Sequence, residues 1–319
     1  MWRIRSGRVG GESVGGGRGR VRALLDSVLQ PVLLGATLLM GTPTLAVGQA
    51  AGAPAGRDTA AAPAAIRSTP LLTPREWHTL AGGALLSIAA HGADLTVRRE
   101  IRATGWQGND GLRALANVGN SWGDPVVLVL GAGLWAGGRV TERPAVAQVG
   151  FRVVEAITVA SVATKVLKGA VGRARPRVSP DDAWDVAFGR GFGSATGNGD
   201  YESFPSGHAT AAFAFASAVT AEVRRVAPER ARLVGATTYG LAAATMYARM
   251  YRDAHWLSDV TMGATIGTVG GWVVTRWHSA HPGSAIDRAA LGTGRSALAP
   301  YLAPGPRGDT RLGVTLAWR

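Results

Sequence analysis

Three short stretches of the sequence combine cations, histidines and a carboxylate at spacings that could build a site for a phosphate group. In chain order they are Lys168–Pro176, Phe204–His208 and Arg249–Asp259. Lysine and arginine attract anions, and histidine can act as a nucleophile or move a proton at mildly acidic to neutral pH. The three stretches therefore indicate phosphoryl transfer, provided that the fold brings them to one place.

The cations and one helix start are the candidates for holding the phosphoryl oxygens. Lys168 offers a point charge, whereas Arg175 and Arg249 can each grip two oxygens with a planar guanidinium fork. A proline followed by Ser206 and Gly207 marks the start of a helix, where unpaired backbone N–H groups and the helix dipole favour an anion. These five residues form the predicted phosphate-binding set.

The histidines and one aspartate are the candidates for the chemical step. His255 and Asp259 are four residues apart and would share a face of a helix, so the carboxylate can fix the imidazole tautomer and leave the other nitrogen as a nucleophile. His208, with an ordinary pKa near 6.5, can protonate the leaving oxygen. A metal site made of these three residues is the alternative, but the neighbouring cations would repel a metal ion. We therefore predict no metal.

Apolar helical patterns must position these residues. They cover about 75–93, 124–138, 145–168, 207–224, 231–250 and 256–277, and most are at the short end of what crosses ~30 Å of hydrocarbon. The first stretch ends one helix, the second begins the next, and two antiparallel passes return the third to the same side. The sequence predicts an all-α bundle of about six hydrophobic helices, embedded in a membrane, with the site at one rim.

Composition narrows the class of protein. The chain has 319 residues, a net charge of +13, 46% hydrophobic residues and only 17% charged residues. The arginines are scattered and no basic stripe is interleaved with aromatic residues, which argues against nucleic acid as a partner. The absence of cysteine excludes disulfides, thiolate metal sites and a lipidated cysteine anchor. The sequence gives no indication of an oligomeric state.

The two ends of the chain differ from the bundle. A basic segment, an apolar run over 23–45 and the small residues around Ala50 predict a signal peptide over 1–50, or an uncleaved signal anchor. An Ala/Pro-rich linker follows over 51–72, then the helical domain over 73–282 and a tail over 283–319. In the tail, alternation between Arg311 and Trp318 predicts one short strand or hairpin.

The three stretches resemble the signature of the type 2 phosphatidic acid phosphatase and vanadium haloperoxidase superfamily, which reads K-x6-RP, then PSGH, then R-x5-H-x3-D. All three parts occur in order over 168–259; one departure is Ala248, where many members have Ser. The resemblance implies a phosphohistidine on His255, oriented by Asp259, with His208 as the acid for the leaving group. It implies that Lys168, Arg175, Ser206, Gly207 and Arg249 hold the phosphoryl oxygens, without a metal cofactor.

The same resemblance implies a phosphatase acting on phosphomonoesters or pyrophosphates of lipids, of the phosphatidate or polyprenyl pyrophosphate class, with a membrane as partner. The alternatives are a soluble periplasmic acid phosphatase and, less favoured, a vanadium-dependent haloperoxidase. The expected location is a bacterial-type inner membrane with the rim facing the periplasm, because arginines gather in the 222–232 connection. A cleaved signal followed by six spans would place the rim inside instead, unless the first pattern, broken by His91 and Asp94, does not cross.

Overall fold

The computed structural model describes residues 70–318 apart from 124, 197–198, 294–295 and 305–309. The predicted signal segment, and the predicted linker except for its last three residues, lie outside this part of the chain. Six longer helices form the bundle: α2 (Pro74–His91), α6 (Val126–Val140), α7 (Pro144–Val171), α8 (Gly207–Val226), α9 (Ala231–Tyr251) and α10 (Leu257–Ala280). The prediction of an all-α bundle of about six hydrophobic helices is confirmed.

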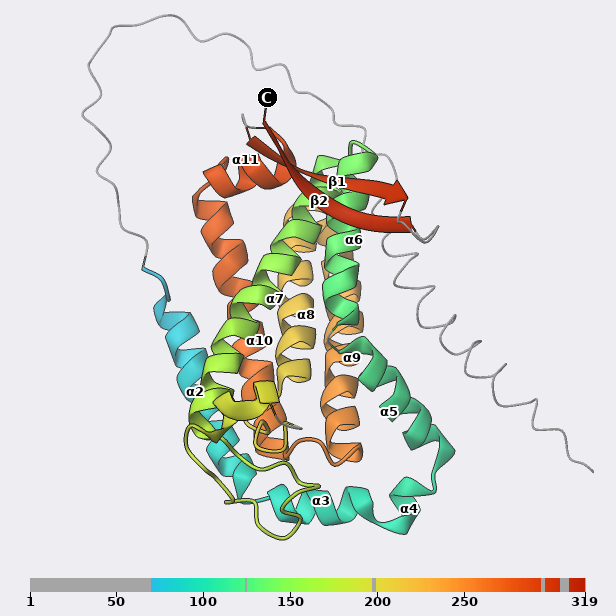
Figure 1. Ribbon diagram of the computed structural model, residues 1–319, viewed down its shortest axis with the longest axis vertical. Coiled ribbons are helices and arrows are strands. Elements are labelled where there is room, and N and C mark those ends of the chain that lie inside the picture. Colours follow the sequence, from blue (N-terminus) through green and yellow to red (C-terminus); the bar gives the residue numbers. More distant parts are fainter. Residues whose placement is uncertain (1–69, 124, 197–198, 294–295, 305–309, 319) are drawn as a thin grey trace, which may run out of the picture. The chain divides into compact units, whose positions relative to one another are not determined.

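Helix α8 is the central helix of the bundle and packs against α7, α9 and α10 (Figure 1). Its close approach to α10 depends on Gly263, Gly267 and Gly271, which recur every four residues along α10. A methyl group at any of the three would overlap atoms of α8. The contact begins at the first turns of both helices, and it therefore brings the Phe204–His208 stretch next to the start of α10.

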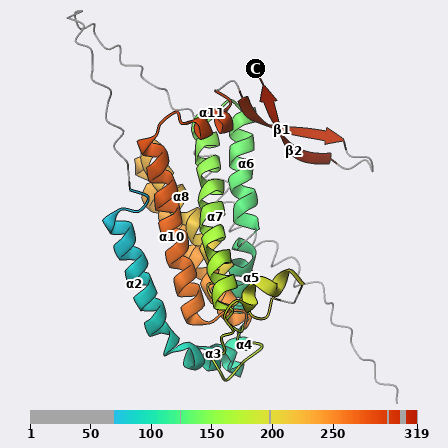
Figure 2. The ribbon, with the colours of Figure 1, turned by 60° about the vertical axis from the view of Figure 1, so that its left-hand side comes forward.

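Several shorter elements were not predicted. Helices α3 (Asp94–Arg102), α4 (Thr104–Gln107) and α5 (Asp110–Trp122) follow α2, and two short 3₁₀ segments cover Arg190–Thr196 (η1) and Pro228–Arg230 (η2). Figure 2 shows α2 alongside α10, with α3 crossing below the end of the bundle. A search for apolar runs misses α3 because five of its nine residues are charged.

The predicted tail begins with a further helix, α11 (Ala285–Leu291), and continues as an antiparallel hairpin of β1 (Ser296–Pro304) and β2 (Thr310–Trp318). In its register Tyr301 lies opposite Gly313. The tail thus forms a hairpin, as predicted, but its first strand, β1, begins well before the alternating segment between Arg311 and Trp318. Proline and alanine in that strand hide the alternation that marks its partner.

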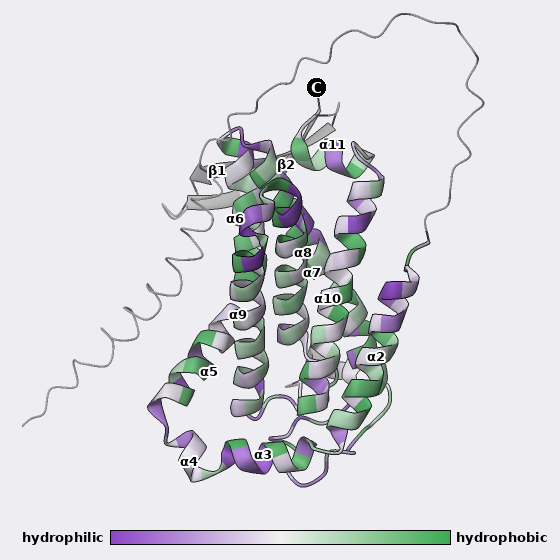
Figure 3. Cartoon of the chain, turned by 180° about the vertical axis from the view of Figure 1, so that it is seen from behind, coloured by the Kyte–Doolittle hydropathy of each residue, from purple (hydrophilic) through white to green (hydrophobic). Residues whose placement is uncertain are grey.

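The hydropathy of the described helices supports fewer membrane spans than the six considered from the sequence. Among the described residues, only α7 is a helix long and apolar enough to cross a membrane by itself, and α2 with α3 passes the same test as a pair bent by 62°. Figure 3 shows the hydrophilic residues gathered in α3 and near the ends of the bundle helices. Helices α8, α9 and α10 have the length but not the apolar character, because they are rich in Ala, Gly and Thr.

Candidate active site

The three predicted stretches meet at one end of the bundle, the lower end in Figure 1. Lys168 lies in the last turn of α7, Gly207 and His208 open α8, and His255 lies in the turn between α9 and α10. The chain leaves α7 at Gly172, whose positive φ of 60° lets its N–H group donate to the Lys168 carbonyl. The prediction that helix order places all three stretches on one rim agrees with this arrangement.

His255 is oriented for attack through its Nε2 atom. The side chain is only 3% exposed, and its Nδ1 atom lies 2.7 Å from the backbone carbonyl oxygen of Ser203. A carbonyl oxygen can only accept, so Nδ1 carries the proton and Nε2 keeps its lone pair. Burial lowers the pKa of His255 well below 6.5, so the imidazole is neutral at physiological pH. A neutral imidazole with a free Nε2 is the nucleophilic form.

Asp259 holds the turn around His255 rather than the imidazole alone. The expected shared helix face does not occur, because α10 begins at Leu257 and His255 precedes it. The Asp259 carboxylate instead accepts from the Trp256 N–H group at 2.8 Å and from the Ser203 hydroxyl. Its Oδ2 atom is 3.6 Å from Nδ1 of His255, which is too long for a good hydrogen bond. Asp259 therefore stabilises the imidazole by its charge and by fixing Ser203.

Arg173, which was not predicted, is the ionic partner of Asp259. Its Nη1 atom lies 2.6 Å from Asp259 Oδ1, and Nη2 lies 2.8 Å from Asp94 Oδ2. All three side chains are buried. A buried charge needs a partner and hydrogen bonds, and here one guanidinium joins two carboxylates. Arg173 is thus the cation that pairs directly with Asp259, and it shares its charge with Asp94.

The end of α2 and the start of α3 complete this network. Asp94 accepts from the Ser258 N–H at 2.9 Å and from the Ser258 hydroxyl at 2.6 Å, and His91 Nδ1 lies 3.0 Å from Arg173 Nη2. The imidazole of His91 packs edge-on against Trp184 at 3.9 Å between ring centroids. His91 and Asp94 are the residues that interrupt the first apolar pattern, and that interruption is the signal in the sequence that could have found them.

Three cations of the predicted set surround the histidines. Lys168 is buried and its Nζ donates to the Glu202 carbonyl, and Arg175 Nε donates to the Gly199 carbonyl at 2.8 Å. Arg249 donates from Nη1 to the Asn120 side chain at 2.8 Å, while its buried Nε–H group has no partner among the described residues. An unmet buried donor on a guanidinium is a position where an anionic oxygen would bind.

His208 lies among these cations. Burial lowers the pKa of His208, and the charges of Arg249, Arg175 and Lys168 lower it further, to about 4. The pKa of His208 thus lies well below the ordinary histidine value near 6.5. A bound phosphate brings negative charge and raises the pKa again, so we expect His208 to become an acid only when the site is filled. The ring also packs on Gly123, where a methyl group would collide with it.

Ser206 and Gly207 contribute a helix start. Ser206 is the N-cap of α8; its hydroxyl accepts from the Ala209 N–H group at 3.5 Å, and its own N–H donates to the Asp259 carbonyl at 3.0 Å. The hydroxyl thus caps α8 through a long hydrogen bond, and it is also a candidate phosphate ligand. The N–H groups of Gly207 and His208 have no partner inside their own helix, as in any first turn, and remain for an anion.

The arrangement does not resemble a metal site. In the part of the chain that the structure describes, no group of three His, Asp or Glu side chains is placed to hold a metal ion. The site combines a neutral nucleophilic imidazole, a second imidazole and three cations. It can bind a tetrahedral anion and transfer its central atom to Nε2 of His255.

Comparison with known proteins agrees with this geometry. No curated protein matches the sequence. The crystal structure of a transmembrane PAP2 type phosphatidylglycerolphosphate phosphatase from Bacillus subtilis has a similar fold, with a TM-score of 0.50 and 16% identity. The match covers 66% of this chain and 100% of that one. The model of the PAP2 superfamily matches residues 150–282, a range that includes the three stretches.

Proposed function

We propose that this protein is a phosphatase that forms a phosphohistidine on His255 and acts on lipid phosphates. The observation that carries the proposal is the placement of Lys168, Arg175 and Arg249 around His208, where burial and their charges lower the pKa of His208 to about 4. The buried Nε–H group of Arg249 has no partner among the described residues, which leaves a donor for a phosphoryl oxygen. A site that keeps three buried or half-buried cations together is complete only when an anion is bound.

The reaction follows from the placement of the groups. Nε2 of His255 attacks phosphorus, the P–N bond forms as the bond to the leaving oxygen breaks, and His208 gives its proton to that oxygen. Water then attacks the phosphohistidine, His208 takes the proton from the water, and the P–N bond breaks to release inorganic phosphate. Arg175, Arg249 and the first turn of α8 stabilise the negative charge on the equatorial oxygens in both steps.

The surroundings of the rim support a lipid substrate. The loop between α7 and α8 carries large apolar side chains that are mostly exposed: Trp184 is 76% exposed, and Phe188 and Phe192 are exposed as well. Exposed aromatic side chains next to a phosphate site suit the boundary between headgroups and acyl chains of a bilayer. We propose association with a bacterial inner membrane and a rim that faces the periplasm.

Substrate preference tests the lipid assignment. We expect a higher kcat/KM for phosphatidate, a polyprenyl pyrophosphate or another lipid phosphate in mixed micelles than for p-nitrophenyl phosphate, because acyl chains add apolar contacts beside the phosphate. The measurement is steady-state kinetics of phosphate release, with the detergent concentration held constant. A higher kcat/KM for the water-soluble ester would favour the alternative of a soluble acid phosphatase.

The network behind Asp259 gives a second prediction. Replacing Asp94 by Asn keeps the shape and most hydrogen bonds but removes the second anion bound by Arg173, so Arg173 should shift and loosen the hold of Asp259 on the His255 turn. We expect kcat to fall about tenfold with little change in KM, because the phosphate ligands are untouched.

The matched control is Arg98→Lys. Arg98 also ties α3 to the turn that precedes His255, through two 2.8 Å bonds to Asp253, but it does not contact Asp259. We expect this variant to keep kcat within about threefold. If both variants lose kcat equally, then general anchoring of α3 matters and the specific contact between Arg173 and Asp259 does not.

A further inference from the structure

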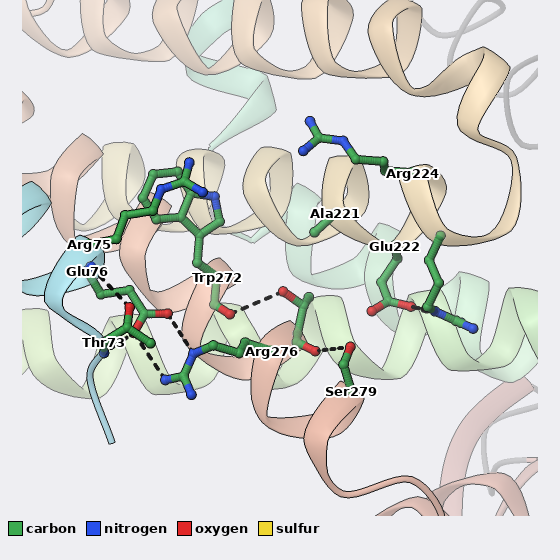
Figure 4. Close-up of a pocket in the computed structure, with 11 residues that line it drawn as sticks. Thr73, Arg75, Glu76, Ala221, Glu222, Arg224, Trp272, Arg276 and Ser279 are labelled. Carbon is green, nitrogen blue, oxygen red and sulfur yellow. Dashed lines mark hydrogen bonds and ion pairs between the residues drawn. The ribbon is translucent and has the colours of Figure 1, made fainter. Parts of the chain in front are cut away.

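A cavity of about 690 Å³ lies between α2, α8 and α10, at the end of the bundle opposite the catalytic rim (Figure 4). Helix α8 begins at the rim with Gly207, and Glu222 in the cavity wall lies 15 positions later. At 1.5 Å per residue, these two positions are about 22 Å apart along the helix. The cavity is therefore separate from the phosphatase site.

The charges that line the cavity do not balance. Four arginines and two glutamates contribute to the wall: Arg75, Arg224, Arg225, Arg276, Glu76 and Glu222. Both carboxylates are already matched. Arg276 makes two bonds to Glu76, at 2.9 and 3.1 Å. Arg225 bonds to Glu222 at 3.1 Å, and Arg152 bonds to it at 2.8 Å from behind the wall. Four positive and two negative charges leave the lining with an excess of two positive charges.

The excess is carried by Arg75 and Arg224. The Arg75 guanidinium lies 4.5 Å from the centre of the Trp272 ring, in a cation–π contact that holds it in place. In the described part of the chain, neither Arg75 nor Arg224 lies within ion-pair distance of a carboxylate. Figure 4 shows both side chains at the cavity, Arg75 over Trp272 and Arg224 on the neighbouring helix. A guanidinium group on an indole face, with a second guanidinium group in the same cavity lining, is suited to a phosphate with an apolar attachment.

A buried ion pair behind the cavity wall also has an unmet donor. Arg152 and Glu222 are buried, and the Nε–H group of Arg152 has no partner among the described residues. Arg152 also lines a smaller cavity of about 280 Å³, which shares Arg225 and Ser279 with the larger one. The positive potential therefore extends from the surface into the helix packing, and it is not confined to mobile surface side chains.

We propose that this cavity binds the phosphate group of an anionic phospholipid headgroup, without hydrolysing it. Basic pockets between helices on the cytoplasmic side of a membrane are a recurrent way to bind anionic lipids. Among the described residues no histidine lines the cavity, so this lining has no counterpart of His255 for phosphoryl transfer. The source of the ligand rests on the proposed association with a membrane, whereas the binding itself does not depend on catalysis at the rim.

Native mass spectrometry of the full chain in detergent tests the proposal. The protein is incubated with phosphatidylglycerol, with phosphatidylcholine or with inorganic phosphate, and orthovanadate is present throughout to occupy the rim. We expect one retained phosphatidylglycerol, no retained phosphatidylcholine, and a Kd for phosphatidylglycerol that rises at least about tenfold in R75Q/R224Q. The matched control is R232Q, at an exposed position of α9 that does not line the cavity, and it should keep the wild-type Kd.

Three results would overturn the proposal: equal weakening by R75Q/R224Q and R232Q, equal retention of phosphatidylcholine, or retention of inorganic phosphate without phosphatidylglycerol. Both altered arginines are exposed, so the fold of the double variant should persist, which a thermal melt verifies. The same variant should hydrolyse p-nitrophenyl phosphate at the wild-type rate. A wild-type protein that hydrolyses p-nitrophenyl phosphate but retains no phosphatidylglycerol would contradict this proposal alone, whereas one that retains phosphatidylglycerol without hydrolysing any phosphate ester would contradict the proposed phosphatase function alone.

Discussion

Replacing His255 by Ala should abolish phosphatase activity, with a loss of at least about 10³-fold in kcat, while the protein stays folded. The nucleophile is then absent, and in the described part of the rim no other histidine has its Nδ1 proton fixed by a backbone carbonyl. Within the described structure the His255 side chain hydrogen-bonds to the Ser203 carbonyl alone, so its removal should affect stability much less than catalysis. The measurement is phosphate release, with circular dichroism to check the helical content.

Trapping the phosphohistidine tests the same prediction directly. Wild-type enzyme that is quenched with base during turnover of a ³²P-labelled substrate should carry label that is stable in alkali and lost in acid, as expected for a phosphoramidate. The His255→Ala variant should carry none, whereas His208→Ala should still accept label from a substrate whose leaving group needs no proton. Full activity of the His255→Ala variant would contradict the mechanism.

The helices of the bundle could be predicted from the sequence because the apolar pattern that marks each helix lies within that helix. Six apolar patterns gave six helices, and helix order alone placed Lys168, His208 and His255 at one end. The buried residues behind the catalytic groups, Asp94 and Arg173, could not be predicted in this way. Asp94 reaches Arg173 from 79 positions earlier in the chain, and nothing within either segment shows that the two are partners.

Two further features depend on tertiary environment. The pKa of His208 is about 4 because burial and three cations act on it together, and sequence spacing carries no measure of burial. The contact between His255 and Asp259 was expected from a helical spacing of four, yet it arises because Asp259 folds back over the start of α10. The pair of His255 and Asp259 was predicted. Its geometry also depends on Ser203, which contacts both side chains and which no helical pattern could identify.

The two arginines at the end of α9 offer an internal comparison, because both are charged, lie three residues apart and contact the same neighbouring helix. Arg249 donates to Asn120 at 2.8 Å and Arg252 donates to Asn117 at 3.0 Å, so each is held by an asparagine of α5. The difference lies in the rest of each guanidinium. Arg249 keeps a buried Nε–H without a partner in the described structure, and its charge acts on His208. Arg252 is exposed.

Lysine at either position keeps the positive charge but loses the planar fork. At Arg249 the fork would span two phosphoryl oxygens in the transition state, so Arg249→Lys should lower kcat/KM about 10²-fold, or ~2.7 kcal/mol at 1.36 kcal/mol per decade. At Arg252 the fork donates to Asn117 and to no other described residue, and Arg252→Lys should lower kcat/KM less than about threefold. The measurement is kcat/KM of both variants on the same substrate, by steady-state kinetics. Equal losses would mean that positive potential in general, and not a shaped phosphate site at Arg249, binds the substrate.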